Sequence, residues 1–120
     1  MTVVVVSCGD PRYHAPPIVV TFDPNFSPPA SLETGASAGI AAVVANGNNN
    51  NSVGFTCTPA GQCGTFTPSA SSSGVPVCYL APAQVPAGNT VTVTATSGAD
   101  ATKFVSGMIT IVNGAPNPCP

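Results

Sequence analysis

Strict alternation of apolar and hydroxyl residues marks the clearest element of the chain, Thr90 to Thr96. Val91, Val93 and Ala95 alternate there with four threonines. A period of two residues places successive side chains on opposite faces of a β-strand, so that one face can be buried and the other exposed. β-Branched residues on both faces suit a pleated sheet. The pattern predicts a strand that buries its valines and presents its threonines to solvent.

Further short runs of apolar or β-branched residues predict additional strands. They lie at residues 18–22, 39–45, 53–56, 75–80 and 104–112. The segments between them are rich in turn residues, and the chain holds 14 prolines and 12 glycines. The asparagine-rich segment 46–51 is predicted to be a hairpin loop, and no stretch predicts a helix. Six or seven strands at a spacing of roughly ten residues favour an all-β fold, an antiparallel β-sandwich.

Three parts of the chain follow from this pattern. Residues 18–112 form the predicted sandwich, residues 1–17 an N-terminal extension that opens with the β-branched strand Thr2–Val6, and residues 113–120 a C-terminal tail. The alternation also divides the strand residues into two sets. The set predicted to point inward, together with Phe55, contains Ile40, Ala42, Val44, Val77, Tyr79, Val91, Val93, Val105, Ile109 and Ile111. The apolar set predicted to point outward contains Ala41, Val43, Ala45, Cys78 and Leu80 on one sheet, and Phe104 and Met108 on the other.

Charge is scarce, and this narrows the classes of function. The chain has 2 Lys or Arg and 4 Asp or Glu, so charged residues make up 5% of it, where an ordinary globular chain has about 25%. A basic surface for nucleic acid is therefore excluded. No apolar run approaches the ~20 residues of a membrane-spanning helix. His14 has no second histidine or carboxylate cluster to complete a metal or catalytic set, so we predict no cofactor and no enzyme activity.

Five cysteines in a chain of this size suggest an oxidising compartment. Cys57 and Cys63 lie six residues apart around a Pro–Gly turn, a spacing that predicts a structural disulfide. Cys8, Cys78 and Cys119 remain. Two of these three can form a second disulfide, and Cys8 or Cys119 could instead reach a neighbouring subunit.

Two segments resemble a known family. The stretches VGFTCTPAGQCGTFTP and SGVPVCYLAPAQVPAGNTVTVTATSGADATKFVSGMITI resemble bacterial Ig-like (Big-type) repeat domains, which occur in secreted and surface proteins, notably of acidobacteria. The resemblance covers about residues 18–112 and implies an Ig-like sandwich without catalytic residues. Phe55 stands where the family usually has Trp. The family mostly places Thr or Ser at the outward strand positions, where this chain has several apolar residues.

The extension and the outward apolar residues lead to a functional hypothesis. The run that opens the extension lacks the polar alternation of a half-exposed strand, so it is expected to be covered on both faces, in part by another subunit. The residues of this run, expected to make the assembly contact, are Thr2, Val3, Val4, Val5 and Val6. The expected receiving surface contains Ala41, Val43, Leu80, Phe104 and Met108.

This hypothesis implies a self-assembling protein. We expect a secreted subunit that joins head to tail with itself in an extracellular fibre or surface appendage, because contacts of this kind do not close. The alternative is an adhesion or carbohydrate-contacting module of a longer repeat protein.

Overall fold

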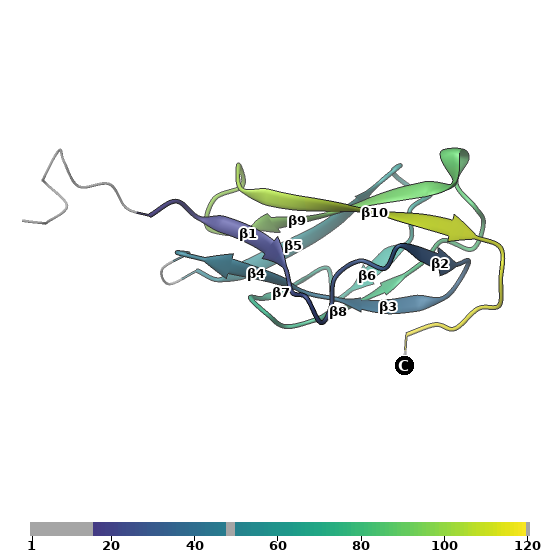
Figure 1. The fold of residues 1–120 in the computed structure, drawn as a ribbon, viewed down its shortest axis with the longest axis horizontal. Helices are drawn as coiled ribbons and strands as arrows, with labels where there is room; N and C mark the ends of the chain where they lie inside the picture. Colours follow the sequence, from purple (N-terminus) through teal and green to yellow (C-terminus); the bar gives the residue numbers. More distant parts are fainter. Residues whose placement is uncertain (1–15, 48–49, 120) are drawn as a thin grey trace, which may run out of the picture.

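The structure, a computed structural model, describes residues 16–47 and 50–119 (Figure 1). The strands are β1 (Val19–Phe22), β2 (Ser31–Glu33), β3 (Ser37–Ile40), β4 (Ala42–Ala45), β5 (Ser52–Thr58), β6 (Thr65–Thr67), β7 (Ala70–Ser72), β8 (Val77–Leu80), β9 (Thr90–Ser97) and β10 (Phe104–Val112), and one 3₁₀ turn, η1 (Ala87–Asn89), precedes β9. The prediction of an all-β sandwich is confirmed.

The predicted N-terminal strand falls on residues that the structure does not describe. The prediction that this run is a strand covered on both faces therefore stays a prediction. The residues named in the sequence analysis that lie outside the described part are Thr2, Val3, Val4, Val5, Val6, Cys8 and His14.

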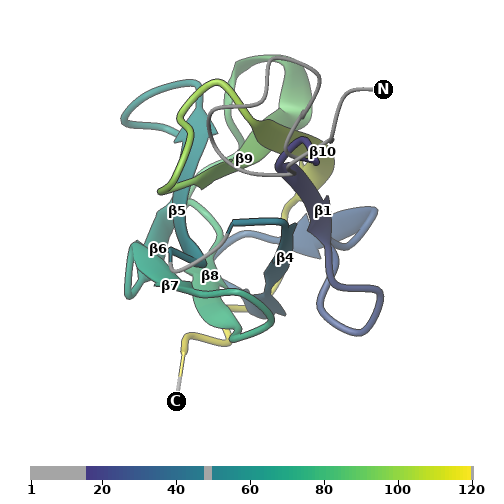
Figure 2. The same ribbon diagram turned by 90° about the vertical axis from the view of Figure 1, so that its left-hand side faces the viewer.

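Two layers form the sandwich (Figure 2). One layer is a five-stranded sheet in the order β2-β10-β9-β5-β7. The other combines the sheet β3-β8-β6 with the pair β1-β4, which is its continuation because β3 and β4 are separated only by Ala41. Reading β3 and β4 as one interrupted strand gives the orders β1-β3/β4-β8-β6 and β5-β9-β10. These are the ABED and CFG orders of an immunoglobulin sandwich, with β2 and β7 added at the edges of the second sheet.

The alternating segment lies in the centre of the five-stranded sheet. β9 pairs antiparallel with β10 on one side, with Val91 opposite Ile109, and with β5 on the other, with Ala95 opposite Phe55. Val91, Val93 and Ala95 are fully buried, and the threonines between them are half-buried on the outer face. The hydroxyl groups of Thr94 and Ser106 hydrogen-bond across the strands at 2.9 Å. β9 therefore shows a hydroxyl-lined outer face and an apolar inner face, as the period of two residues predicts.

The core contains almost all of the predicted inward residues. Phe55 is buried, and its ring lies 5.7 Å from that of Phe66, which in turn lies 5.1 Å from the ring of Tyr79. Val105 is the exception, because it is only partly buried at the margin of the core. The fully buried side chains with the largest volumes are Tyr79, Ile40, Ile109, Ile111, Val53, Val77, Val91 and Val93.

Four details of the fold differ from the sequence prediction. The described part of the structure has ten strands rather than six or seven. The sequence analysis missed the short polar strands β2, β6 and β7 because they lack a clear apolar pattern. β2 pairs parallel to β10, so the sandwich is not wholly antiparallel. The segment between β4 and β5 crosses from one sheet to the other, so the prediction of a hairpin loop at 46–51 is wrong. The turn η1 is the one helical element among the described residues.

Ala41 is the clearest correction, because it is fully buried rather than outward and exposed. The loop after β1 returns to this position: the N–H of Asp23 donates to the carbonyl of Ala41, and the N–H of Ala41 donates to the carbonyl of Phe26, both at 2.9 Å. These bonds interrupt the strand between β3 and β4 and cover Ala41. The three consecutive residues Ile40, Ala41 and Ala42 are therefore all buried, which strict alternation does not allow.

The first strand begins and the last strand ends at opposite ends of the domain. β1 begins at the left-hand end in Figure 1, and β10 ends at the right-hand end, from which the tail turns back beneath the domain. The described start of the chain, residues 16–18, leads away from the sandwich at the left-hand end. The N-terminal extension is therefore attached at the end opposite to the last residue of β10.

Candidate functional site

The first disulfide closes a small loop at the end of β5. It joins Cys57 and Cys63, the pair that the spacing predicts, with Cα atoms 5.8 Å apart. Tyr79 fixes this loop from the opposite sheet, because its hydroxyl donates a buried hydrogen bond to the carbonyl of Cys63. Burial raises the pKa of Tyr79 to about 12, since a low-polarity environment disfavours the phenolate. Gly64 follows with a φ of +91°, and a side chain there would meet the backbone of Leu80.

The second disulfide ties the C-terminal tail to β8. Cys78 is bonded to Cys119 with Cα atoms 6.0 Å apart and a sequence separation of 41. Of the alternatives left open for these cysteines, the structure has the second disulfide within one chain, which leaves Cys119 without a thiol for a neighbouring subunit. The fifth cysteine, Cys8, lies outside the described residues.

Hydrogen bonds hold the tail along its path from one layer to the other. The N–H of Ala115 donates to the carboxylate of Glu33 at 3.1 Å, and the N–H of Asn117 donates to the carbonyl of Gly35 at 3.0 Å. Ala36 and Asn117 form a parallel bridge. The tail therefore adds a short strand-like contact to the domain and links the β10 layer to the β8 layer.

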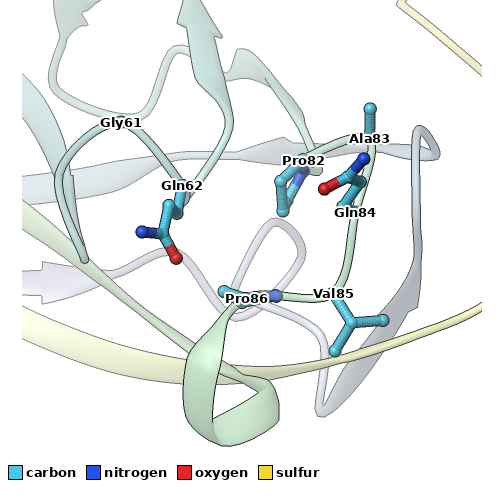
Figure 3. Close-up of a pocket in the computed structure, with 7 residues that line it drawn as sticks. All are labelled: Gly61, Gln62, Pro82, Ala83, Gln84, Val85 and Pro86. Carbon is cyan, nitrogen blue, oxygen red and sulfur yellow. The ribbon is translucent and has the colours of Figure 1, made fainter.

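A shallow hollow of about 280 Å³ lies between the first disulfide loop and the segment that leads to η1 (Figure 3). Gly61 and Gln62 form one side, and Pro82, Ala83, Gln84, Val85 and Pro86 form the other. None of these side chains carries a charge or a nucleophile. The hollow offers two amides and several apolar surfaces, which suit hydrogen bonding and contact but not acid–base or covalent chemistry.

Titratable groups do not form a reactive cluster in residues 16–47 and 50–119. No group of three or more His, Cys, Asp or Glu side chains there could hold a metal ion. The pKa of Asp100 is lowered because Thr102 donates hydrogen bonds to its carboxylate from both the hydroxyl and the backbone N–H, at 2.6 and 3.0 Å. This arrangement caps the turn between β9 and β10. It is a structural contact rather than an acid–base site.

The structure does not gather the predicted receiving surface into one patch. Phe104 and Met108 are 59% and 66% exposed on the outer face of β10, while Val43 and Leu80 are half-buried on the other sheet. Ala41 is buried, as described above. Phe104 and Met108 alternate along β10 with less exposed residues, and Val112 continues their row. The outward apolar residues therefore lie on opposite faces of the sandwich.

An open strand edge is the feature that the sequence pattern did not reveal. β1 pairs only with β4, in a register that sets Val19 opposite Ala45 and Thr21 opposite Val43. The hydrogen bond from the N–H of Asp23 to the carbonyl of Ala41 continues this register. Backbone groups in an antiparallel pair alternate in direction, so those of Val19 and Thr21 face β4, and those of Val20 and Phe22 face away from it, as does the carbonyl of Ile18 directly before β1. No backbone partner for these three residues exists on that side in the described part of the chain.

The described residues contain no helix long and apolar enough to cross a membrane. Comparisons with protein-family models, with characterised proteins and with solved structures find no match to this chain.

Proposed function

We propose that this protein is a structural subunit of an extracellular fibre or surface appendage, in which the N-terminal run Thr2–Val6 of one subunit adds as a strand to the next. One observation carries the proposal: in the described part of the chain, residues between Ile18 and Ile111 already form a continuous hydrophobic core. The five-residue β-branched run Thr2–Val6 precedes them in the sequence, and such a run is costly to leave in water.

The disulfides and the low charge agree with this role. Two disulfides within 120 residues are typical of proteins that work in oxidising, extracellular compartments. Charged residues at strand edges normally oppose edge-to-edge association. With 5% charged residues, this chain has little such protection.

The proposed contact is of the head-to-tail kind, because the donor run and the strand that receives it are different parts of the chain. A contact between one part of a subunit and a different part of the next subunit does not close on itself unless the rotation forms a ring, so it generates filaments. Phe104 and Met108, the exposed members of the expected receiving surface, are available for additional contacts between neighbours.

Deletion of residues 1–7 tests the proposal. The full-length protein is expected to sediment as large assemblies at high concentration, and the shortened protein as a folded monomer. Val4→Asp serves as a matched variant, because it keeps the length of the extension and places one charge in the run. A monomeric full-length protein, or a shortened protein that forms the same assemblies, would contradict the proposal.

The hollow in Figure 3 favours a second candidate, an adhesion or carbohydrate-contacting module. Its two amides, Gln62 and Gln84, are the side chains there that can recognise hydroxyl groups, although no aromatic side chain lines it. Titration of the protein with oligosaccharides, followed by NMR, tests this function. Shifts confined to residues 61–62 and 82–86 would support it, and the absence of shifts at millimolar sugar would reject it.

A further inference from the structure

We propose that the acceptor for Thr2–Val6 is the outer edge of β1, and that the donor is a second copy of the chain. This inference rests on the proposed function, because it names the receiving site of the same assembly. It differs from the sequence expectation, which placed the receiving surface on Ala41, Val43, Leu80, Phe104 and Met108. Ala41 is buried and the other four lie on two opposite faces, whereas an added strand needs one continuous edge of backbone groups.

The backbone of β1 provides this edge. The N–H and C=O groups of Val20 and Phe22, and the carbonyl of Ile18 directly before β1, point away from β4 and have no backbone partner among the described residues. From Ile18 to Phe22 the edge spans five residues, and the donor run Thr2–Val6 also has five. An added strand of this length would pair all three residues. Unpaired edge groups of this kind are a template for another chain.

The side chains around the edge are apolar except Thr21, which is exposed on the outer face. Val19 is 46% exposed on the outer face, and Ile18 and Phe22 are partly buried against the core. Val105, also partly buried, belongs to β10, which is adjacent to β1 (Figure 2). A strand added at this edge would therefore meet apolar surface on its inner face. On its outer face the added run would lie beside Val19, which is exposed, so valines of the run would contact apolar side chains there as well.

The edges of β2, β6, β7 and β10 are less suitable acceptors. β2, β6 and β7 are edge strands of three residues each, and β7 consists of alanine and two serines. The outer edge of β10 is occupied from Thr110 onward by Ala30 and β2, and Pro28 packs on Gly107. Prolines beside a strand protect its edge because they donate no hydrogen bond. In the described part of the chain, β1 has neither a covering strand nor a proline within it.

The connection to β1 favours a donor from a second copy over the same chain. Pro16 and Pro17 directly precede Ile18 and restrict the backbone to an extended form. The described start of the chain leads away from the sandwich (Figure 1). Docking onto its own β1 would need residues 7–17 to close a hairpin loop, whereas such loops usually have about 2–5 residues.

Two variants of the full-length chain test this site. One has a damaged donor run and the other a damaged acceptor edge. Val4→Asp damages the donor and leaves the edge intact. Val20→Pro removes an N–H that faces the open edge, keeps the ladder to β4, and should weaken assembly by about tenfold or more through the lost hydrogen bond and the ring that obstructs the incoming strand. Each variant alone should remain monomeric, and an equimolar mixture should form a dimer of one copy of each that grows no further.

Because Val20 is buried, Val20→Pro could also lower the stability of the domain. A substitution at an exposed residue separates obstruction of the edge from loss of stability. Val19→Lys places a charge beside the edge on an exposed residue and should also abolish assembly. Val75→Lys is its matched control, since Val75 is exposed to a similar degree, 49%, but belongs to no strand. Val75→Lys should assemble like the unmodified protein.

Hydrogen exchange of the unmodified protein gives the decisive result. The amides of Val20 and Phe22 should become protected as concentration rises and assemblies form. Assemblies in which these amides exchange freely would overturn the acceptor site and leave the proposed function standing. Protection that does not depend on concentration would show docking within one chain and would overturn the second copy as donor. A protein without assemblies at any concentration would instead contradict the proposed function, on which this inference rests.

Discussion

Removal of the tail disulfide should lower the stability of the protein more than any other change outside the core. Cys78 and Cys119 have a sequence separation of 41. In the chain-entropy model, closing a loop of that length in the unfolded state is worth about 4 kcal/mol. Replacing both cysteines by alanine should lower the free energy of unfolding by this amount. The tail contacts, such as the bond from Asn117 to Gly35, will add little once the tail is released.

The first disulfide provides the comparison. Cys57 and Cys63 have a sequence separation of only 6, for which the same model gives roughly 2–2.5 kcal/mol. Tyr79 continues to hold the loop through the carbonyl at residue 63 when both cysteines are replaced. The two double variants should therefore differ in the free energy of unfolding by about 1.5–2 kcal/mol, with the tail variant less stable.

Urea unfolding without reducing agent measures this difference. Both double variants should carry Cys8→Ser, so that no spare thiol can exchange, and Cys8→Ser alone is the reference. Similar m-values would show that the folded and unfolded states compared are the same. If the tail variant loses less stability than the variant of the short loop, loop length does not determine the contribution of these disulfides.

Three individual side chains give further predictions. Phe55→Ala should cost ~3–5 kcal/mol in denaturant melts, because it removes a buried ring from the aromatic chain of the core; a loss under about 1 kcal/mol would show that the site collapses or is not core. Stability should be full below pH 10 and fall between pH 10 and about 12, because the pKa of Tyr79 is raised on folding and the unfolded state loses its proton first; Tyr79→Phe should lack this fall, and an unchanged pH profile would refute the assignment. Gly64→Ala should destabilise the domain much more than Gly61→Ala, since both glycines have positive φ but only a side chain at Gly64 meets the backbone of Leu80; equal losses in thermal melts would show that the φ alone matters.

The sequence predicts the long strands well because their physics is local. In β9 the apolar residues recur at every second position, and burial follows that period. In β10 burial also has a period of two residues and is complete at Ile109 and Ile111. Phe55 is likewise buried as predicted. Short polar strands such as β7 cannot be found this way, because they exist only through pairing with a neighbouring strand.

Other features depend on contacts between distant parts of the chain. Ala41 is buried because Asp23 and Phe26 return to it, and no pattern around residue 41 indicates this loop. The partner of Cys78 depends on the path of the tail, so the sequence left it open. The open edge of β1 also needs the register with β4, since that register decides which backbone groups face outward. The receiving surface was therefore predicted from side chains, whereas the acceptor that we propose is a backbone edge.

Negative-stain electron microscopy of the purified full-length protein tests the central claim most directly. We expect fibres from the unmodified protein at high concentration, and single particles from Val4→Asp under the same conditions, because the charge prevents the run from entering an apolar site. Single particles from the unmodified protein, or fibres from Val4→Asp that match those of the unmodified protein, would contradict the claim that Thr2–Val6 joins the subunits.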